Sequence, residues 1–255
     1  MAPRRFLNGV TTVSSSDPLG GLDVLDPTKW SVYFEDFTGP LFNTNTINNT
    51  TVTHNGLSII ASDVATVSVT TDAGALDGCL KFTTTSADNK SAWIQTASPG
   101  FVMTAGKKFI METKLEITPG AGGAIAQQEM FVGLASYSAS ATAFFATDGT
   151  ARAFDDGIGW ITTDAATDID LIIGENDVFD TQTAVSTYAS GTWYTLTAYY
   201  DGADLHYYAN GIKTGVITPN QIPVSVVGPT FYLKTGEAKI HTLLVDYLMV
   251  AKERS

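Results

Sequence analysis

Three carboxylates stand close together in the segment Glu175-Asn176-Asp177-Val178-Phe179-Asp180. Hydrolysis of a glycosidic bond uses two such groups, one as nucleophile or base and one as acid, about 5–5.5 Å apart in retaining enzymes. Glu175 and Asp180 would suit that chemistry if both side chains were aimed at one sugar. Residues 174–177 (Gly-Glu-Asn-Asp) are typical of a turn, however. We therefore interpret the segment as an exposed acidic loop and predict no catalytic residue.

The wider stretch 148–180 holds nine acidic residues against one basic residue, Arg152. Calcium takes about six to eight oxygen ligands, which Asp carboxylates and backbone carbonyls could supply. The spacing matches no EF-hand loop, so a solvated acidic rim is the favoured interpretation. The histidines His54, His206 and His241 lie in separate strand regions and form no zinc or nucleophile-base pattern. No metal or other cofactor is expected.

The composition limits both the class and the partners. A chain of 255 residues that is 44% apolar fits one large β-sandwich domain. Its net charge of −12 argues against nucleic acid and against an anionic membrane as partners. Cys79 is the single cysteine, so no intrachain disulfide can form. The N-terminus lacks the apolar core of a signal peptide, and no segment approaches the roughly 20 apolar residues of a membrane span. We therefore expect a protein of a reducing cytosol.

Short strand-like segments separated by turn residues run through residues 30–255, which predicts a single antiparallel sandwich domain. The predicted strands are 31–37, 50–61, 64–71, 79–85, 92–96, 107–118, 129–137, 159–162, 168–173, 192–209 (a pair), 212–218, 224–233 and 240–251. The last strand is apolar on both faces apart from Asp246, which predicts a central position in its sheet. Period-two alternation predicts a core that includes Tyr194, Leu196, Tyr200, Leu205, Val245 and Tyr247.

The most specific segment is residues 191–211, which read GTWYTLTAYYDGADLHYYANG. Two aromatic strands meet at Asp201-Gly202 and close on Asn210-Gly211, and such pairs tolerate the positive φ of tight hairpin turns. This pattern resembles the paired inner strands of concanavalin/laminin-G-like jelly rolls. That resemblance implies an all-β, antiparallel jelly-roll sandwich, a fold that serves lectins, glycosidases, adhesins and viral coat proteins.

Two functions of that fold can be weighed against residues of this chain. Laminarinase-type glycosidases on this fold carry an E-x-D-x-x-E motif, and the segment 175–180 departs from it because Asp180 is one methylene shorter than Glu. In a lectin, exposed aromatic side chains stack on the sugar. Trp160, Trp193 or the tyrosines could do so here, although packing between two sheets explains most of them more simply.

Three blocks resemble a family of tailed-bacteriophage virion structural proteins. They are PRRFLNGVT at residues 3–11, DPTK with the following aromatic strand at 26–37, and the paired ending at 193–202 and 245–254. The resemblance implies a capsid decoration, or cement, protein on the virion surface, made in the host bacterial cytoplasm. It would bind the major capsid protein, associate as a dimer or trimer, and have no enzymatic activity. The alternatives are a carbohydrate-binding adhesin module on the virion or, less favoured, a glycosidase that uses Glu175 and Asp180.

Residues 1–29 show no strand or helix period and are punctuated by Pro and Gly, which predicts an extended N-terminal arm. Fully extended, such an arm could reach roughly 95–105 Å. In the decoration role, Arg4 and Arg5 would pair with carboxylates of the shell, and Phe6 and Leu7 would be apolar anchors. We predict these four residues as the partner-binding site.

Overall fold

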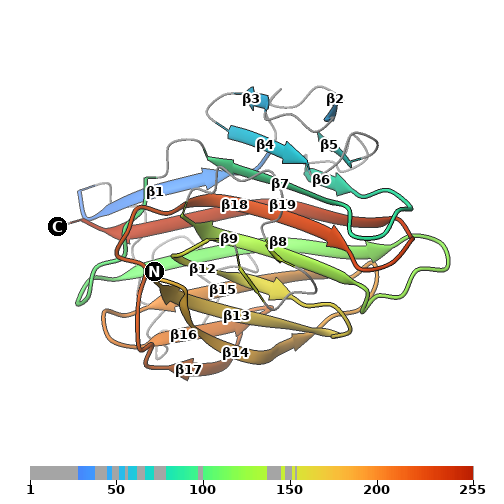
Figure 1. Cartoon of the computed structure of the whole chain (residues 1–255). Helices are drawn as coiled ribbons and strands as arrows, with labels where there is room; N and C mark the ends of the chain where they lie inside the picture. Colours follow the sequence, from blue (N-terminus) through green and yellow to red (C-terminus); the bar gives the residue numbers. More distant parts are fainter. Residues whose placement is uncertain are drawn as a thin grey trace, which may run out of the picture.

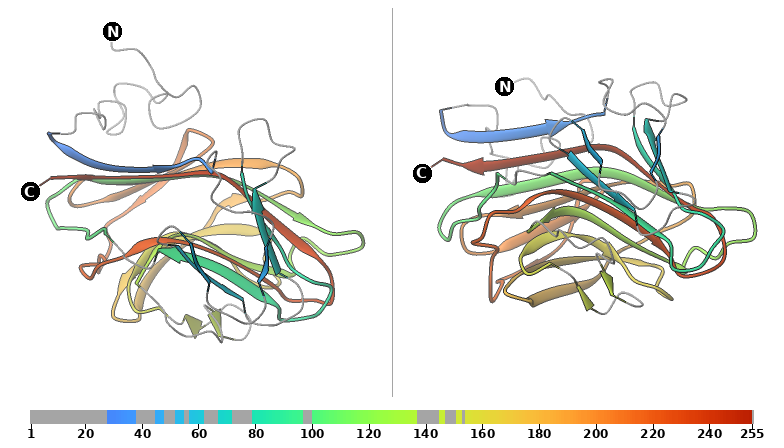
Figure 2. Two further views of the ribbon diagram at one scale, coloured as in Figure 1. Left: turned by 90° about the horizontal axis from the view of Figure 1, so that it is seen from above. Right: turned by 45° about the horizontal axis from the view of Figure 1, so that its top comes forward.

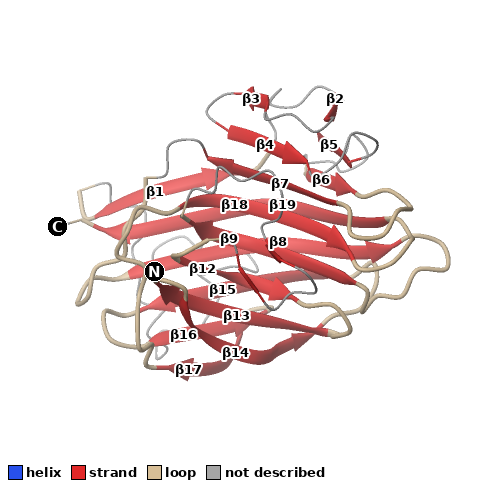
Figure 3. Ribbon diagram, viewed as in Figure 1, coloured by secondary structure: helices blue, strands red, loops and turns tan. Residues whose placement is uncertain are grey.

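The structure is a computed structural model of the whole chain. The residues that it describes are 28–37, 79–96, 100–136 and 154–254, together with the strand segments 45–47, 52–54, 57–61, 67–71, 145–146 and 151–152. Within these residues the secondary structure is all β, as Figure 3 shows. No helix in this part of the chain has the length and apolar character needed to cross a bilayer.

The described strands form two antiparallel sheets that face one another as a sandwich (Figures 1 and 2). Sheet A has the order β17-β16-β15-β8-β19-β6-β5-β2, with β1 also paired to β19. Its strands are β1 (Trp30–Glu35), β2 (Asn45–Ile47), β5 (Val67–Thr71), β6 (Leu80–Thr83), β8 (Phe109–Pro119), β15 (Trp193–Tyr200), β16 (Leu205–Ala209), β17 (Ile212–Ile217) and β19 (His241–Glu253). This architecture confirms the predicted antiparallel β-sandwich.

Sheet B has the order β14-β13-β12-β9-β18-β7-β4-β3. Its strands are β3 (Val52–His54), β4 (Leu57–Ala61), β7 (Ser91–Thr96), β9 (Gln128–Ala135), β12 (Gly157–Thr162), β13 (Asp168–Glu175), β14 (Val178–Thr187) and β18 (Gly228–Thr235). A two-stranded ladder of β10 (Phe145–Ala146) and β11 (Ala151–Arg152) lies on the outer side of this sheet (Figure 2, left). Residues 55–56 of the predicted strand 50–61 and the predicted arm up to residue 27 fall outside the described residues.

The main core lies between the sheets and follows the predicted alternation. On β15, Tyr194, Leu196, Ala198 and Tyr200 point inward and are at most 7% exposed. The same holds for the odd-numbered apolar residues of β8, which include Phe109 and Ile117. The hairpin ends as predicted, because Asn210 and Gly211 both adopt a positive φ. The aromatic segment 191–211 therefore forms the adjacent strands β15 and β16 of sheet A, next to the edge strand β17. Tyr194 and Tyr200 point into the sandwich, and Tyr199 and Tyr208 lie on the outer face.

The prediction that Tyr247 belongs to this core is wrong. The pairing of β19 with β8 shifts register between Val245 and Tyr247, so a bulge breaks the alternation. Val245 points into the sandwich, and after the bulge Leu248 and Val250 do so in place of Tyr247 and Met249. The predicted central position of this strand is confirmed, since β19 lies between β8 on one side and β6 and β1 on the other.

Candidate functional site

The predicted turn around residue 176 is the tip of a hairpin between two long strands. Asn176 and Asp177 have φ values of 51° and 63°, and they join β13 to β14. The Asp180 carboxylate lies on β14 and accepts hydrogen bonds from the backbone N–H (2.6 Å) and the side-chain amide (2.7 Å) of Asn220. Glu175 is hydrogen-bonded at 3.2 Å to the neighbouring Asn176 amide. Both carboxylates thus stabilise local loops. The strand β14 was not predicted from the sequence.

Other acids of the stretch 154–180 bind backbone or hydroxyl donors of the same hairpins. Asp156 Oδ1 accepts the Asn176 N–H at 3.0 Å, and Asp170 Oδ1 accepts the Ala184 N–H at 2.8 Å. The described residues contain no group of three or more His, Cys, Asp or Glu side chains arranged to hold a metal ion. Asp156 therefore holds the tip of the β13–β14 hairpin, and Asp170 holds the irregular stretch of β14 beside the register shift.

His206 and Asp201 form a local pair. His206 Nε2 lies 3.0 Å from Asp201 Oδ2, and the imidazole stacks on Tyr199 with ring centroids 5.8 Å apart. Asp201 also accepts the backbone N–H groups of Ala203 and Asp204. Burial alone would raise the pKa of Asp201, but these hydrogen bonds outweigh it and lower the pKa. The pair stabilises the turn between β15 and β16.

Two buried glutamates lie on opposite outer faces of the sandwich. Glu112 on β8 accepts hydrogen bonds from the hydroxyls of Thr197 and Tyr247, each 2.8 Å long. Glu129 on β9 lies 3.2 Å from the Lys234 ammonium. Because the core of the sandwich separates the faces that carry them, these two carboxylates cannot act on one sugar.

Aromatic residues divide between the core and the faces. Trp160 is fully buried in the core and cannot stack on a ligand. Trp193 is half-buried on the outer face of sheet A, where the Lys114 ammonium lies 5.0 Å from its ring centroid. Of the two tryptophans considered in the sequence analysis, only Trp193 keeps an accessible ring.

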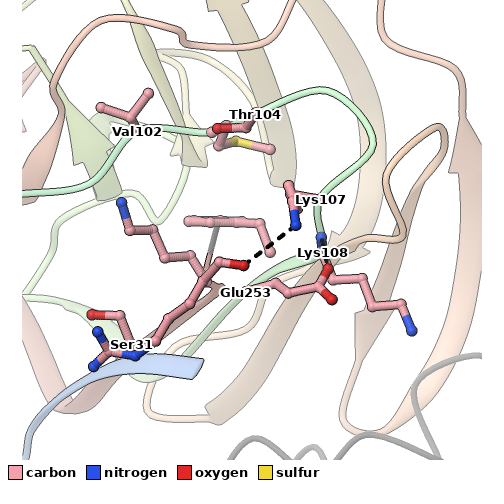
Figure 4. Close-up of a pocket in the computed structure, with 10 residues that line it drawn as sticks. Ser31, Val102, Thr104, Lys107, Lys108 and Glu253 are labelled. Atoms are coloured by element: carbon pink, nitrogen blue, oxygen red, sulfur yellow. Dashed lines mark hydrogen bonds between the residues drawn. The ribbon is translucent and has the colours of Figure 1, made fainter. Parts of the chain in front are cut away.

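A pocket of about 370 Å³ opens where the start of β8 and the end of β19 meet β1 and the loop 100–108 (Figure 4). Its size lies in the lower part of the usual range for small-molecule sites. It is lined by Ser31, Val102, Met103, Thr104, Lys107, Lys108, Phe109, Lys252, Glu253 and Arg254. Hydroxyl groups, cations and one carboxylate thus line the pocket together with apolar side chains.

Antiparallel pairing brings these lining residues together. Lys252 pairs with Phe109, and the ladder continues with a hydrogen bond of 2.9 Å from the Glu253 N–H to the Lys108 carbonyl. The Lys107 ammonium reaches the Arg254 carbonyl at 3.4 Å, drawn as a dashed line in Figure 4. The sequence by itself does not reveal this pocket. The basic residues before β8 and at the end of β19 were visible in the sequence, but the pairing of those strands was not.

The predicted partner-binding residues Arg4, Arg5, Phe6 and Leu7 lie outside the described residues. Their contact with a capsid, the predicted oligomer and the virion location stay predictions.

No protein-family model matches this sequence, and no curated protein matches it. Solved structures do match in fold. Peanut lectin superposes with a TM-score of 0.56 at 16% identity, over 89% of this chain and 99% of the lectin. An endo-1,3-β-glucanase from Streptomyces sioyaensis has a TM-score of 0.52 at 15% identity, over 88% of this chain and 96% of its own.

An endo-β-1,4-glucuronan lyase from the fungus Trichoderma reesei also has a TM-score of 0.52, at 12% identity, over 88% of this chain and 95% of the lyase. These likenesses show that the chain has a concanavalin/lectin-like jelly-roll fold. They include both lectins and enzymes, so the fold alone does not separate binding from catalysis. None of these three structures is a virion protein, and the phage resemblance gains no support from them.

Proposed function

We propose that this protein is a non-catalytic carbohydrate-binding jelly roll whose ligand enters the pocket between β1, β8 and β19. The observation that carries the proposal is the pocket itself, which is large enough for a sugar ring and lined by Ser31 and Thr104 next to several cations. Hydroxyls and amines are suitable partners for the hydroxyl groups of a sugar, and the partly exposed Val102 supplies apolar surface.

The placement of the carboxylates favours binding over hydrolysis. Glycoside hydrolysis needs two carboxyl groups within about 5–10 Å of each other on either side of one bond. Among the described residues, the pocket has one carboxylate, Glu253, and it accepts the Lys108 backbone N–H at 3.1 Å. The candidates Glu175 and Asp180 lie in a different part of the fold, at the β13–β14 hairpin. A lectin-like role requires no such pair.

A steric variant tests the site. Thr104 is exposed at the pocket, so Thr104→Trp should obstruct it without disturbing the core. We expect labelled wild-type protein to bind a subset of glycans on an array, and Thr104→Trp to weaken that binding at least tenfold. Thr183→Trp, an equally large change at an exposed position of β14, should bind like wild type.

Two results would contradict the proposal. One is the absence of binding to any glycan at millimolar concentration by saturation-transfer NMR, with the protein shown to be folded by circular dichroism. The other is release of reducing ends or unsaturated products from a polysaccharide by purified protein, because that would make the protein an enzyme.

A further inference from the structure

We infer that the pocket between β1, β8 and β19 binds the carboxylate of an acidic sugar, so that the ligand is a short uronic-acid oligosaccharide or chain end. This inference rests on the proposed carbohydrate-binding function and specifies its ligand class. The charged side chains that line the pocket, and the partners that some of them already have, carry the inference.

The pocket concentrates positive charge in an acidic protein. The chain has 14 Lys and Arg residues and a net charge of −12. Among the described residues, four of these cations, namely Lys107, Lys108, Lys252 and Arg254, line this pocket together with one carboxylate, that of Glu253. A local excess of cations on an acidic surface attracts anions to that point and leaves the rest of the molecule repulsive to them.

Not all positive side chains of the pocket pair with a carboxylate of the protein. Within the described residues, the Lys252 ammonium makes no ion pair, whereas Lys114 and Lys234 each contact a carboxylate. The Glu253 carboxylate accepts a backbone N–H of Lys108, which holds it along the strand. The pocket therefore has donors to offer an incoming anion.

Arg254 is held in a suitable position for this task. Its Nε donates to the Trp30 carbonyl at 3.1 Å, and its backbone N–H donates to the Lys29 carbonyl at 2.7 Å. One side of the guanidinium is thereby anchored, which lowers the entropy lost when its terminal N–H groups bind a carboxylate. Hydrogen bonds between ionised partners are shorter and roughly twice as strong as neutral ones.

The size and the surroundings of the pocket favour a sugar acid over larger polyanions. At about 370 Å³ the pocket can take a single ring, and its Ser31 and Thr104 hydroxyls can bond the ring hydroxyls. An extended nucleic acid would bring many phosphates against a surface of net charge −12, which opposes binding. A uronate places one negative charge inside the pocket and neutral hydroxyls around it.

Calorimetry with a matched pair of ligands tests the inference. The probes are a glucuronic-acid trisaccharide, its carboxyl-reduced glucose counterpart, and inorganic sulfate. We expect the uronate to bind at least tenfold more tightly than both other probes at 50 mM NaCl. We expect its affinity to fall several-fold at 300 mM NaCl, because salt screens exposed charges.

Charge reversal identifies the residues. Lys107→Glu and Lys252→Glu should each weaken uronate binding at least tenfold, while Lys213→Glu on the exposed strand β17 should leave it within twofold of wild type. Thermal melts establish that each variant is folded. Lys107 is partly exposed in the loop before β8, so its variant keeps the test decisive if Lys252→Glu fails to fold.

The outcomes distinguish the choice of an acidic ligand from the carbohydrate-binding function itself. Equal or better binding of the neutral trisaccharide would overturn the acidic-ligand inference and leave the carbohydrate-binding proposal standing. Sulfate binding as tight as uronate binding would mean a bare anion site and would also overturn the inference. Loss of affinity in Lys213→Glu equal to that in the pocket variants would mean that net charge, not the pocket, attracts the ligand.

Discussion

Glu129 and Lys234 stand directly opposite each other on β9 and β18, with Nζ 3.2 Å from Oε1. Both side chains are nearly inaccessible, at 0% and 6% exposure. Removing one partner from a buried ion pair leaves an uncompensated charge, which costs far more than the intact pair contributes. This pair therefore contrasts with the cations of the pocket, which are accessible to an anion.

We expect Lys234→Met to lower the free energy of unfolding by about 3–5 kcal/mol, because it takes the neighbouring ammonium away from the buried Glu129 carboxylate. Urea unfolding followed by tryptophan fluorescence measures the change. Lys213→Met removes an exposed ammonium and should stay within about 0.5 kcal/mol of wild type. The double variant Glu129→Gln/Lys234→Met should recover part of the loss. A Lys234→Met variant as stable as wild type would show that the ion pair is dispensable.

His241 is a second buried ionisable group with a defined environment. Its Nδ1 lies 3.0 Å from Gln128 Oε1, and its Nε2 lies 3.2 Å from Glu237 Oε1. Burial lowers the pKa of His241 and outweighs the carboxylates of Glu237 and Asp164, which raise it. A histidine whose pKa is lower in the folded than in the unfolded protein is destabilised by protonation.

The sign of the pH effect follows from that shift. Below the ordinary histidine pKa of about 6.5 the unfolded chain binds a proton that the folded protein resists, so the contribution of His241 to stability is full above about pH 6.5 and is lost as pH falls below it. We expect the free energy of unfolding of wild type, relative to His241→Gln, to decrease from pH 7 to pH 5. Parallel pH profiles of the two proteins would refute this assignment.

At the scale of single strands, a bulge changes the direction of a side chain, and a glycine lets an aromatic ring pack against the backbone. The bulge in β19 turns Tyr247 outward, where its hydroxyl reaches Glu112. On sheet B, the Phe131 ring covers Gly159 so closely that a Cβ there would lie 2.6 Å from two ring carbons. Gly159 therefore allows this ring to lie against the strand, in the outer cluster that also contains Trp93 and Tyr232.

Gly159→Ala tests that contact. The added methyl must displace the Phe131 ring inside a packed cluster, and such overpacking costs typically about 1–3 kcal/mol. Gly100→Ala provides the control, because no atom lies within 4 Å of the position where its Cβ would stand. Chemical denaturation compares the two variants. A Gly159→Ala protein no less stable than Gly100→Ala would mean that the ring moves aside freely.

At the scale of the whole molecule, strands far apart in the sequence build both the sandwich and the pocket. Trp30 pairs with Glu253, so β1 and the last strand lie side by side (Figure 1). The pocket draws on β1, β8 and β19 at once. Because these segments contact one another only after the sheets have formed, binding should depend on the folded sandwich and not on any isolated hairpin.

The amino-acid sequence by itself determined the fold class and much of the local structure. Alternating aromatic residues in Trp193–Tyr200 and the turn pair Asn210-Gly211 predicted a hairpin whose inward face is the one observed. These features depend on residues close in the chain, where side-chain period and turn chemistry act directly. The apolar character of Leu243–Val250 likewise predicted a central strand.

The tertiary structure decided which strands pair and in what register. β14 was missed because its exposed polar residues carry no clear period, and pairing with β13 makes it a strand. The outward turn of Tyr247 depends on a bulge against β8, which local alternation cannot reveal. Lys108 and Lys252 are 144 residues apart in the sequence, and only the antiparallel ladder of β8 and β19 brings them into one pocket.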